Sequence, residues 1–590
     1  MRVADYIFKT LADKGVRHCF LVTGGGAMQL NDALRLEKRI KPVCCHHEQA
    51  CAIAAEGYYR ASGRLPVVSV TTGPGGTNAL TGVIGAWLDS IPMIVISGQV
   101  KFSTTIASCP EVPLRQLGDQ EINIIDIVRP VVKYAKMVVE PAQIADELEK
   151  AYRLAISGRP GPVWLDVPLN VQGALLAEPL PVQVEDKQKP AWSGKGMNEF
   201  VTLLAASRRP VVIAGHGIEL DRMEDEFVAL VESAEIPVLS TFCGMNVIPS
   251  DHPLSFGRIG TIGQRAANFV LQNADLVITI GTRNNIRQVS YNWENFAKRA
   301  KKVVIDIDPA ELAKPTVKPD LAICCSAAEF IRAWAAEHMD CRRPEWLAWC
   351  DGMRRKYPAH TPDQMVCEGG VNPYHFFHEL TAVCPVNVDI VAGNGTACVA
   401  LFQTCISKAG QKIFWNSGCA SMGYDIPAAL GAAIATGRLT VCIAGDGSAM
   451  MNLQELETII YCKAPVKILL LANDGYSSIR QTQTNLFSSE LIGCGPSSGV
   501  GLPDFEKIAS AFGFPVEVFD SHDGLRERIE QFLAVDGPAL GVVKIPPSIT
   551  FAPKLSARRN PDGSMASPSL EDMFPFLDRE EMKRNTIGAD

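Results

Sequence analysis

Residues 439–474 have the pattern of a strand, a tight turn, a helix and a second strand. Residues 439–444 are apolar, residues 445–448 are Gly-Asp-Gly-Ser, and residues 452–462 have helical spacing. A second apolar run, residues 466–471, ends just before Asn473. A strand–helix–strand unit of this kind joins two parallel strands by a right-handed crossover. The unit therefore predicts an α/β fold with parallel sheets.

Polar groups follow both strands of this unit. Because the crossover brings the carboxyl ends of the strands to one edge of the sheet, we expect Asp446 and Asn473 to lie together. A carboxylate, an amide oxygen and the carbonyl of Gly475 are a ligand set that suits Mg²⁺. The turn and the start of the next helix suit a diphosphate, bound by Gly445, Gly447 and Ser448. The alternative is an ordinary glycine turn between buried strands.

Length and composition narrow the class of protein. A chain of 590 residues, 47% hydrophobic and 20% charged, is expected to form about three globular domains. The net charge of −8 argues against nucleic acid as a partner. Eighteen cysteines are scattered without a CxxC pair, which indicates reduced thiols in a cytoplasmic protein and no zinc site. The N-terminus lacks the pattern of a secretory signal, and no apolar run is long enough to span a membrane.

The chain order predicts three doubly wound parallel-sheet domains. In the first domain, apolar runs at 18–23, 43–45, 67–71 and 93–97 alternate with helices predicted at 48–62 and 76–87. A polar linker at 185–195 precedes a second domain with strands expected at 210–214, 274–280 and 302–308. His375 and His378 are interpreted as surface or packing residues. The expected domains are 1–182, 190–345 and 371–548, followed by a tail at 549–590 without strands, either a loose arm or a lid.

Two motifs together carry a resemblance to a known family. Asp446 within Gly-Asp-Gly is followed by an Asn 27 positions later, and Glu48 stands in a Cys-Cys-His-His-Glu-Gln-Ala segment at a helix start. The first domain also contains Gly73-Pro74-Gly75. This combination resembles thiamine diphosphate-dependent enzymes, and the resemblance implies that Glu48 contacts the aminopyrimidine ring of the cofactor. Without that context, a carboxylate at a helix start is more often a capping group.

The central domain extends the resemblance to acetolactate synthase-like enzymes. Its pattern alone suits either a nucleotide-sized crevice or a plain scaffold. The segment from Gly281 to Arg287 resembles the family's GxRxxxR motif, although Asn285 and Ile286 replace an acidic pair. The resemblance implies FAD, and an acidic strand end such as Asp306 in the 302–308 segment suits ribose hydroxyls. The FAD-binding residues that it predicts are Arg159, Gly215, Arg283, Arg287 and Asp306.

The match covers about residues 1–545 with motifs in the family's order. In the third domain, the segment Ser-Gly-Cys-Ala-Ser-Met-Gly-Tyr places Met422 where the family has an apolar residue that supports the bent cofactor. A core methionine is the alternative. The resemblance also adds Gly395 and Thr396 to the cofactor site and Gly25 and Gln120 to the catalytic site. It implies a homodimer or homotetramer, because the family site joins Glu48 of one chain to Asp446 of another.

Three departures from the family pattern point to the second substrate. Asp119 replaces a Phe, Leu169 a Lys and Thr482 a Trp at positions that surround the acceptor in the relatives. Losing an indole enlarges a pocket. The sequence therefore resembles flavin-containing carboligases that decarboxylate a 2-oxoacid, pyruvate, and transfer the two-carbon unit to a nucleotide-linked keto-sugar. The alternatives are an acetolactate synthase proper, a simple 2-oxoacid decarboxylase or oxidase, and an inactive cofactor-binding scaffold.

Overall fold

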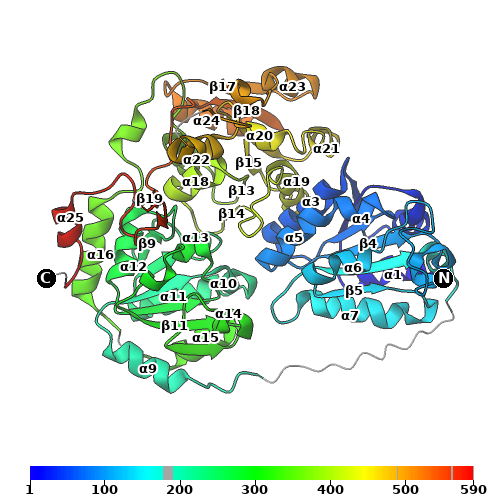
Figure 1. Ribbon diagram of the computed structural model, residues 1–590, viewed down its shortest axis with the longest axis horizontal. Helices are drawn as coiled ribbons and strands as arrows, with labels where there is room; N and C mark the ends of the chain where they lie inside the picture. The colour runs from blue at the N-terminus through cyan, green and yellow to red at the C-terminus, as the bar shows by residue number, and fades with distance from the viewer. Residues whose placement is uncertain (177–190, 340, 488–489, 560–561, 589–590) are drawn as a thin grey trace.

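The computed structural model describes residues 1–176, 191–339, 341–487, 490–559 and 562–588. It contains three six-stranded sheets, and every strand pairing within them is parallel (Figure 1). The predicted fold class is confirmed. Most of the expected linker, residues 185–190, lies outside the described residues, as does the predicted domain boundary at residue 182.

The first sheet has the order β2-β1-β3-β4-β6-β5. Every residue of its inner strands β3, β4 and β6 is buried, as expected for parallel strands covered by helices on both faces. The strands are β1 (His18–Leu21), β2 (Lys41–Cys44), β3 (Val67–Val70), β4 (Ile94–Gln99), β5 (Tyr134–Met137) and β6 (Val163–Pro168). The helices are α1 (Val3–Asp13), α2 (Met28–Leu36), α3 (Glu48–Ser62), α4 (Pro74–Asn78), α5 (Leu80–Asp89), α6 (Ile124–Val128), α7 (Ile144–Ile156) and α8 (Leu169–Gln172).

The central sheet has the order β9-β8-β7-β10-β11-β12, which is the third, second, first, fourth, fifth and sixth strand of the domain. This is the strand order of dinucleotide-binding folds. The strands are β7 (Pro210–Ala214), β8 (Val238–Ser240), β9 (Ser255–Arg258), β10 (Leu276–Ile280), β11 (Lys301–Asp306) and β12 (Leu321–Cys324). The helices are α9 (Met197–Ala206), α10 (His216–Leu220), α11 (Glu224–Ala234), α12 (Arg265–Asn273), α13 (Ile286–Val289), α14 (Pro309–Ala313), α15 (Ala327–Ala336) and α16 (Pro344–Lys356).

The third sheet, β14-β13-β15-β16-β18-β17, repeats the topology of the first. In both, the order reverses between the first and third strands of the domain, and ligands of open α/β sheets bind at such points. The strands are β13 (Asp389–Ala392), β14 (Lys412–Phe414), β15 (Thr440–Gly445), β16 (Val466–Ala472), β17 (Val516–Phe519) and β18 (Ala539–Lys544). The helices are α17 (Pro373–Val383), α18 (Thr396–Thr404), α19 (Asp425–Thr436), α20 (Asp446–Ala449), α21 (Glu455–Tyr461), α22 (Ser477–Phe487), α23 (Phe505–Ala511) and α24 (Leu525–Ala534).

Helices α3 and α19 join the first and third domains (Figure 1). They pack closely because small residues face each other. A Cβ on Gly57 would overlap the carbonyl of Ala428, and a Cβ on Gly431 would overlap the carbonyl of Ala54. The backbone N–H of His46 also donates to Glu455 of the third domain, at 3.0 Å. Glu48 therefore begins a helix that is fixed between two domains.

The tail differs from the prediction of a segment without strands. It contains β19 (Arg558–Arg559), β20 (Met565–Ala566) and α25 (Arg579–Arg584), and it lies along α12 and α16 of the central domain (Figure 1). Asn268 donates to Leu570 O, and Arg265 donates to Pro575 O at 2.6 Å. Side chains of α12 thus satisfy the tail's backbone carbonyls. The sequence did not reveal this packing, because the tail has no hydrophobic periodicity of its own.

Candidate active site and cofactor cavities

The carboxyl edge of the third sheet brings Asp446 and Asn473 together, as the crossover argument predicts. Strands β15 and β16 are neighbours, with Gly445 opposite Leu471. Asp446 is 2% exposed, and its carboxylate accepts hydrogen bonds from the backbone N–H groups of Gly447, Asn473 and Gly475 at 2.7–3.0 Å. Burial raises the pKa of Asp446, and these three donors oppose that rise. The carboxylate is thus oriented by the segments on both sides of it.

Asn473 has one amide atom committed and one free for a ligand. Its Nδ2 donates to Thr396 Oγ1 at 3.2 Å, whereas its buried Oδ1 has no hydrogen-bond partner in the described part of the chain. Gly475 adopts a left-handed φ of 102° that favours glycine. An orphaned amide oxygen beside a buried carboxylate fits a hard divalent cation. Among the described residues no group of three or more His, Cys, Asp or Glu side chains could bind a metal, so a cation here would need amide and carbonyl ligands.

The predicted diphosphate and cofactor residues gather at this edge. The segment expected to be a turn is the first turn of α20, which starts at Asp446 after Gly445. Ser448 Oγ donates to Asp425 at 2.6 Å and accepts from Gly423 N, which ties the loop of half-exposed Met422 to the Gly-Asp-Gly segment. Gly395 and Thr396 follow β13 across the switch point, and a Cβ on Gly395 would meet no atom within 4 Å.

The carboxyl edge of the first sheet positions Glu48. The ring Nδ1 of His47 caps α3 by accepting from Gln49 N, so Glu48 itself does not cap the helix. Glu48 is 8% exposed, and its Oε2 accepts from Asn78 Nδ2 at 3.0 Å. The turn after β3 lies beside it, because a Cβ on Gly75 would stand 3.6 Å from Glu48 Oε1. Glu48 is therefore not the capping group of α3.

The two further predicted catalytic residues flank the same switch point. Gly25 follows β1, and a Cβ there would meet no atom within 4 Å. In contrast, a Cβ on Gly24 would overlap the side chain of Thr71, and a Cβ on Gly26 would overlap that of Thr72. Gln120 is exposed with a φ of 60°, and its carbonyl touches Gly73 so closely that a Cβ there would overlap it. Three loops, after β1, β3 and β4, thus converge at one edge of the sheet.

The three predicted acceptor residues lie on separate elements. Asp119 is exposed beside Gln120, and Leu169 begins α8 at the end of β6. Thr482 is exposed on α22 of the third domain, and its Oγ1 donates to Ser478 O of the same helix. No described residue of α22 is buried. Among the described residues, no hydrogen bond joins Thr482 to Asp119 or Leu169.

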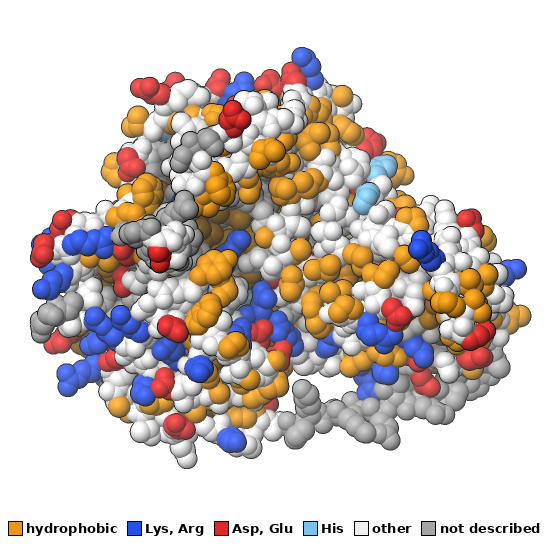
Figure 2. Space-filling view, in the orientation of Figure 1, with side chains coloured by type: hydrophobic (Ala, Val, Ile, Leu, Met, Phe, Trp, Pro, Cys, Tyr) orange, Lys and Arg blue, Asp and Glu red, His pale blue; other side chains and the backbone are white. Residues whose placement is uncertain are grey.

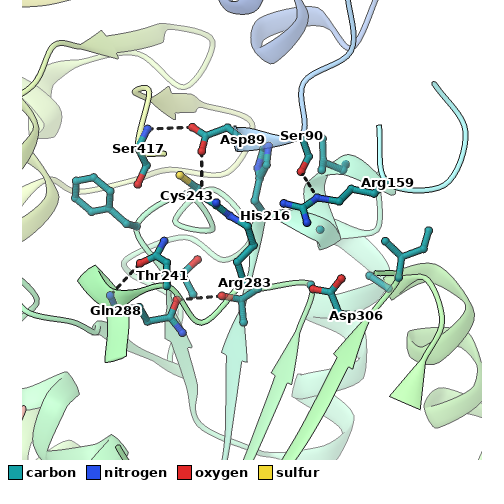
Figure 3. A pocket seen from close by; sticks show the side chains of 18 of the residues that line it. Asp89, Ser90, Arg159, His216, Thr241, Cys243, Arg283, Gln288, Asp306 and Ser417 are labelled. Atoms are coloured by element: carbon teal, nitrogen blue, oxygen red, sulfur yellow. Dashed lines mark hydrogen bonds and ion pairs between the residues drawn. The ribbon is translucent and has the colours of Figure 1, made fainter. Parts of the chain in front are cut away.

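A cavity with an empty volume of about 1030 Å³, open solvent included, lies at the switch point of the central sheet (Figure 3). Four of the five predicted FAD residues line it: Arg159, Arg283, Arg287 and Asp306. The fifth, Gly215, does not line the cavity. A Cβ on Gly215 would overlap Gly281 O, so the turns after β7 and β10 lie close together. Burial raises the pKa of Asp306 to about 6. Figure 2 shows Lys and Arg side chains gathered where the three domains meet.

The cations of this cavity are held by acidic partners. Arg159 pairs with Asp308 at 2.8 Å and Glu311 at 2.9 Å, and its Nε donates to Ser90. Arg283 lies 3.2 Å from Asp89, and the guanidinium of Arg287 stands 5.1 Å from the centre of the Phe242 ring. Two of the three arginines are thus neutralised, and the third rests on an aromatic face.

Sequence reasoning missed three residues of this cavity. Asp89, from α5, accepts from Ser417 N, so the first and third domains both contribute to the wall. His216 also lines the cavity, and its Nε2 has no hydrogen-bond partner among the described residues. Its position between Gly215 and Gly217, after a buried strand, was the available signal. No sequence signal pointed to Asp89 or Ser417, because their contact depends on how the first and third domains pack.

Comparisons with known proteins agree with this architecture. Three models of thiamine pyrophosphate enzymes match: the N-terminal TPP binding domain at residues 1–124, the central domain at 197–334 and the C-terminal TPP binding domain at 393–543. The chain is 30% identical to acetolactate synthase isozyme 1 large subunit of Escherichia coli, over 92% of this chain and 93% of that protein. It is 32% identical to a probable acetolactate synthase large subunit of Methanocaldococcus jannaschii, over 93% and 92%.

A plant relative extends the range of the similarity. Acetolactate synthase of Arabidopsis thaliana is 31% identical, over 91% of this chain and 80% of that protein. Among the described residues, none of the helices is both long and apolar enough to cross a membrane.

The three family models together match well over half of the residues, in chain order. The chain therefore belongs to the thiamine pyrophosphate enzymes, as a thiamine diphosphate-dependent carboligase of the acetolactate synthase type.

Proposed function

We propose that the protein decarboxylates a 2-oxoacid, pyruvate, and transfers the two-carbon unit to a carbonyl acceptor. The observation that carries this proposal is the meeting of Asp446 and Asn473 at one sheet edge, with a free amide oxygen and three backbone donors around the carboxylate. The printed names of the relatives, acetolactate synthases, support the same chemistry. When bound, thiamine diphosphate supplies the acyl-anion chemistry of such a transfer.

This chain's residues have distinct tasks in the proposed site. Asp446 and Asn473, with the carbonyl of Gly475, would hold Mg²⁺, and Gly445, Gly447 and Ser448 would hold a diphosphate beside it. Glu48, buried and fixed by Asn78, would share a proton with the aminopyrimidine ring of a bound cofactor through a carboxylate oxygen. The open space at Gly25 and the exposed amide of Gln120 leave room for the reacting substrate.

Retention of the cofactor tests the metal site. Asp446→Ala removes the only carboxylate proposed as a ligand, so we expect thiamine diphosphate and Mg²⁺ to be lost on dialysis, as measured by mass spectrometry and metal analysis. Asp474→Ala, at a neighbouring carboxylate that is not a proposed ligand, is the control. Unchanged cofactor occupancy in Asp446→Ala would contradict the site.

For the central cavity we propose FAD. The supporting features are its place at the switch point of a dinucleotide-binding strand order, three arginines for a pyrophosphate and Asp306 for a ribose. The flavin would be structural, because carboligation needs no net electron transfer. We expect a yellow protein that releases FAD on denaturation and an Arg287→Gln variant with reduced flavin content. Arg355→Gln, at an exposed residue of α16, is the control. A colourless and fully active protein would exclude FAD.

For the acceptor we propose a bulky carbonyl compound, in the first place a nucleotide-linked keto-sugar. The support is the small, polar Thr482 and Asp119 at positions where the family resemblance implies a Trp and a Phe. Acetolactate synthesis is the second candidate, favoured by the names of the relatives. Mass spectrometry of products from pyruvate with a panel of 2-oxoacids and nucleotide keto-sugars separates the two. Products from 2-oxoacid acceptors alone would establish the second candidate.

A flavin oxidase and an inactive scaffold would each give a different result from a carboligase. The oxidase would consume oxygen with pyruvate. The scaffold would bind thiamine diphosphate and release no CO₂ from any 2-oxoacid. Oxygen uptake and CO₂ release, measured on the same preparation, therefore separate both from the proposed function.

We also propose a homodimer or homotetramer. Its support is the set of exposed apolar side chains on and around α20 and α21, namely Met450, Met451 and Tyr461. Figure 2 shows hydrophobic side chains over this part of the surface. Light scattering of the purified protein tests the assembly, and a monomer at micromolar concentration would contradict it.

A further inference from the structure

A second cavity lies between the central and third domains, away from both proposed cofactor sites. Its walls come from β8, β9, α16 and α17, from the segment that follows α16, and from residues 404–407 at the end of α18. Its empty volume is about 1030 Å³, open solvent included. Arg258 lines this cavity, whereas the next residue, Ile259, lines the FAD cavity. The two cavities therefore lie on opposite sides of the end of β9.

Basic side chains line the wall of this second cavity. It contains Arg258, Arg354, His360 and His378, and no Asp or Glu side chain contributes to it among the described residues. Arg354 is neutralised by Asp351 at 2.6 Å. The histidine rings of the wall stack on each other, with their centres 4.1 Å apart. A ligand in this space would thus meet positive charge and polar rings.

Arg258 is a buried charged residue in the wall of the cavity. It is 5% exposed, and its guanidinium donates to Phe402 O, Cys405 O and Ser250 Oγ, each at 2.7 Å. These acceptors are neutral, and in the described part of the chain no carboxylate lies within ion-pair distance of Arg258. A buried charge without a counter-ion is costly. Phe402 O and Cys405 O lie at the C-terminal end of α18 and offset part of the charge, but no carboxylate in the described part of the chain supplies a full counter-charge.

The remaining wall combines apolar side chains with hydroxyl groups. Met245, Ile248, Phe256 and Ile406 provide apolar surface, while Ser255 and Ser407 provide hydroxyl groups. Inorganic anions would leave the apolar wall uncovered. We propose that this cavity binds a small organic anion, a carboxylate or a phosphate monoester with an apolar portion, and that Arg258 supplies the counter-charge.

The proposal is tested by calorimetric titration of the holoenzyme, saturated with thiamine diphosphate, Mg²⁺ and FAD. The probes are hexanoate and adenosine 5′-monophosphate, with hexanol, adenosine and inorganic phosphate as comparisons. We expect hexanoate or the nucleotide to bind at least tenfold more tightly than its neutral analogue and than inorganic phosphate. The two probes distinguish a carboxylate from a phosphate ligand. Equal affinity for inorganic phosphate, or no binding of either organic anion, would overturn the proposal.

Matched variants locate the binding. Arg258→Gln keeps an N–H donor for the carbonyl acceptors and removes the charge, so we expect affinity to fall at least tenfold. Arg265→Gln is the control, because Arg265 is also buried and donates to carbonyls but does not line the cavity. Ala359→Trp fills the exposed mouth without removing a charge and should also abolish binding. Equal weakening in Arg258→Gln and Arg265→Gln, or full binding in Ala359→Trp, would refute the assignment.

Discussion

At the scale of single residues, orientation matters as much as identity. Asp446 is held by three backbone donors, and Glu48 is fixed by Asn78 while His47 caps the helix in its place. Both carboxylates are therefore preorganised before any ligand binds. Preorganised groups lose little free energy on binding, which is why single substitutions at these positions are informative.

Glu48→Gln is expected to keep the fold and lower turnover. The amide can still accept from Asn78, but it cannot exchange a proton, and a positioned acid–base group contributes roughly 10²–10⁴-fold. The measurement is kcat for CO₂ release from pyruvate, together with Tm and bound thiamine diphosphate. Near-native turnover in a variant that retains its cofactor would remove Glu48 from the catalytic site.

Asp166, in β6, predicts a pH-dependent stability. It is fully buried, and burial raises its pKa to about 7, although Ser97 Oγ donates to it at 2.6 Å. Since the folded form then binds the proton more tightly than the unfolded chain, this residue's stabilisation is present at low pH and is lost as pH rises towards 7. The loss is about 1.4 kcal/mol per pH unit between the two pKa values.

Asp166→Asn should remove that dependence, because an amide does not titrate. We expect the Tm of the variant to exceed that of the wild type near pH 8 and the difference to shrink or reverse near pH 5. Thermal unfolding at several pH values measures this, and Asp126→Asn, at an exposed carboxylate, is the control. Parallel pH profiles for wild type and Asp166→Asn would show that the buried carboxyl does not titrate in this range.

At the scale of elements, the crossing of α3 and α19 sets where Glu48 stands relative to the third domain. Small residues allow the two backbones to touch at Gly57 and Gly431. Adding a methyl group at such a contact overpacks it and costs about 1–3 kcal/mol. Helix α22, which carries Thr482, is less restricted, since none of its described residues is buried.

Gly431→Ala is expected to lower stability, because its Cβ would overlap Ala54 O. The loss should lower Tm by several degrees, as measured by calorimetry. Gly352→Ala in α16 is the matched control, since no atom lies within 4 Å of its Cβ position. In that open position alanine should be neutral or stabilise by up to about 1 kcal/mol. Equal Tm values for the two variants would contradict the tight crossing.

Thr482→Trp tests the acceptor proposal on α22. Because Thr482 is exposed and bonds only within its own helix, the larger side chain should not disturb the fold. Decarboxylation of pyruvate should remain nearly intact, transfer to a bulky acceptor should collapse, and transfer to 2-oxobutyrate should survive. Each kcal/mol of lost fit lowers the rate roughly fivefold. A constant ratio of bulky to small product would place Thr482 outside the acceptor pocket.

At the scale of the whole molecule, the first and third domains share one strand order and pack through α3 and α19. Two candidate edges, one with Glu48 and one with Asp446, thus occur in every chain. A symmetric dimer would present each edge to its complement in the partner. The exposed apolar residues on and around α20 and α21 would then be covered.

Mixing chains tests whether two subunits share a site. Glu48→Gln and Asp446→Ala chains are each expected to be inactive alone. If the two residues of one site come from different chains, half of the randomly mixed dimers contain one intact site, so about a quarter of wild-type activity should return. Assay of the whole mixture after refolding from a denatured equimolar solution measures this, and the purified mixed dimers should reach about half of wild-type activity. Inactive mixed dimers would place both residues of a site in the same chain.

The sequence alone determined the features that depend on neighbouring residues. Strands ending in Gly-Asp-Gly or Gly-Gly-Gly, and the helix that starts at Glu48, are local, and a right-handed crossover then places Asp446 beside Asn473 without further information. Arg283, Arg287 and Asp306 lie at or after strand ends of the central sheet and line one cavity for the same reason, whereas Arg159 reaches that cavity from the first domain. What the sequence could not supply was which side chains from different domains meet.

Only the tertiary structure decided the contacts between distant segments. The meeting of Asp89 with Ser417, the seating of the tail on Asn268 and the burial of Arg258 against Phe402 O each join residues more than 100 positions apart. No periodicity encodes such pairs, because a side chain's partner across a domain interface depends on how whole helices and sheets pack. The charge of Arg258 was visible in the sequence, but its burial without a described carboxylate was not.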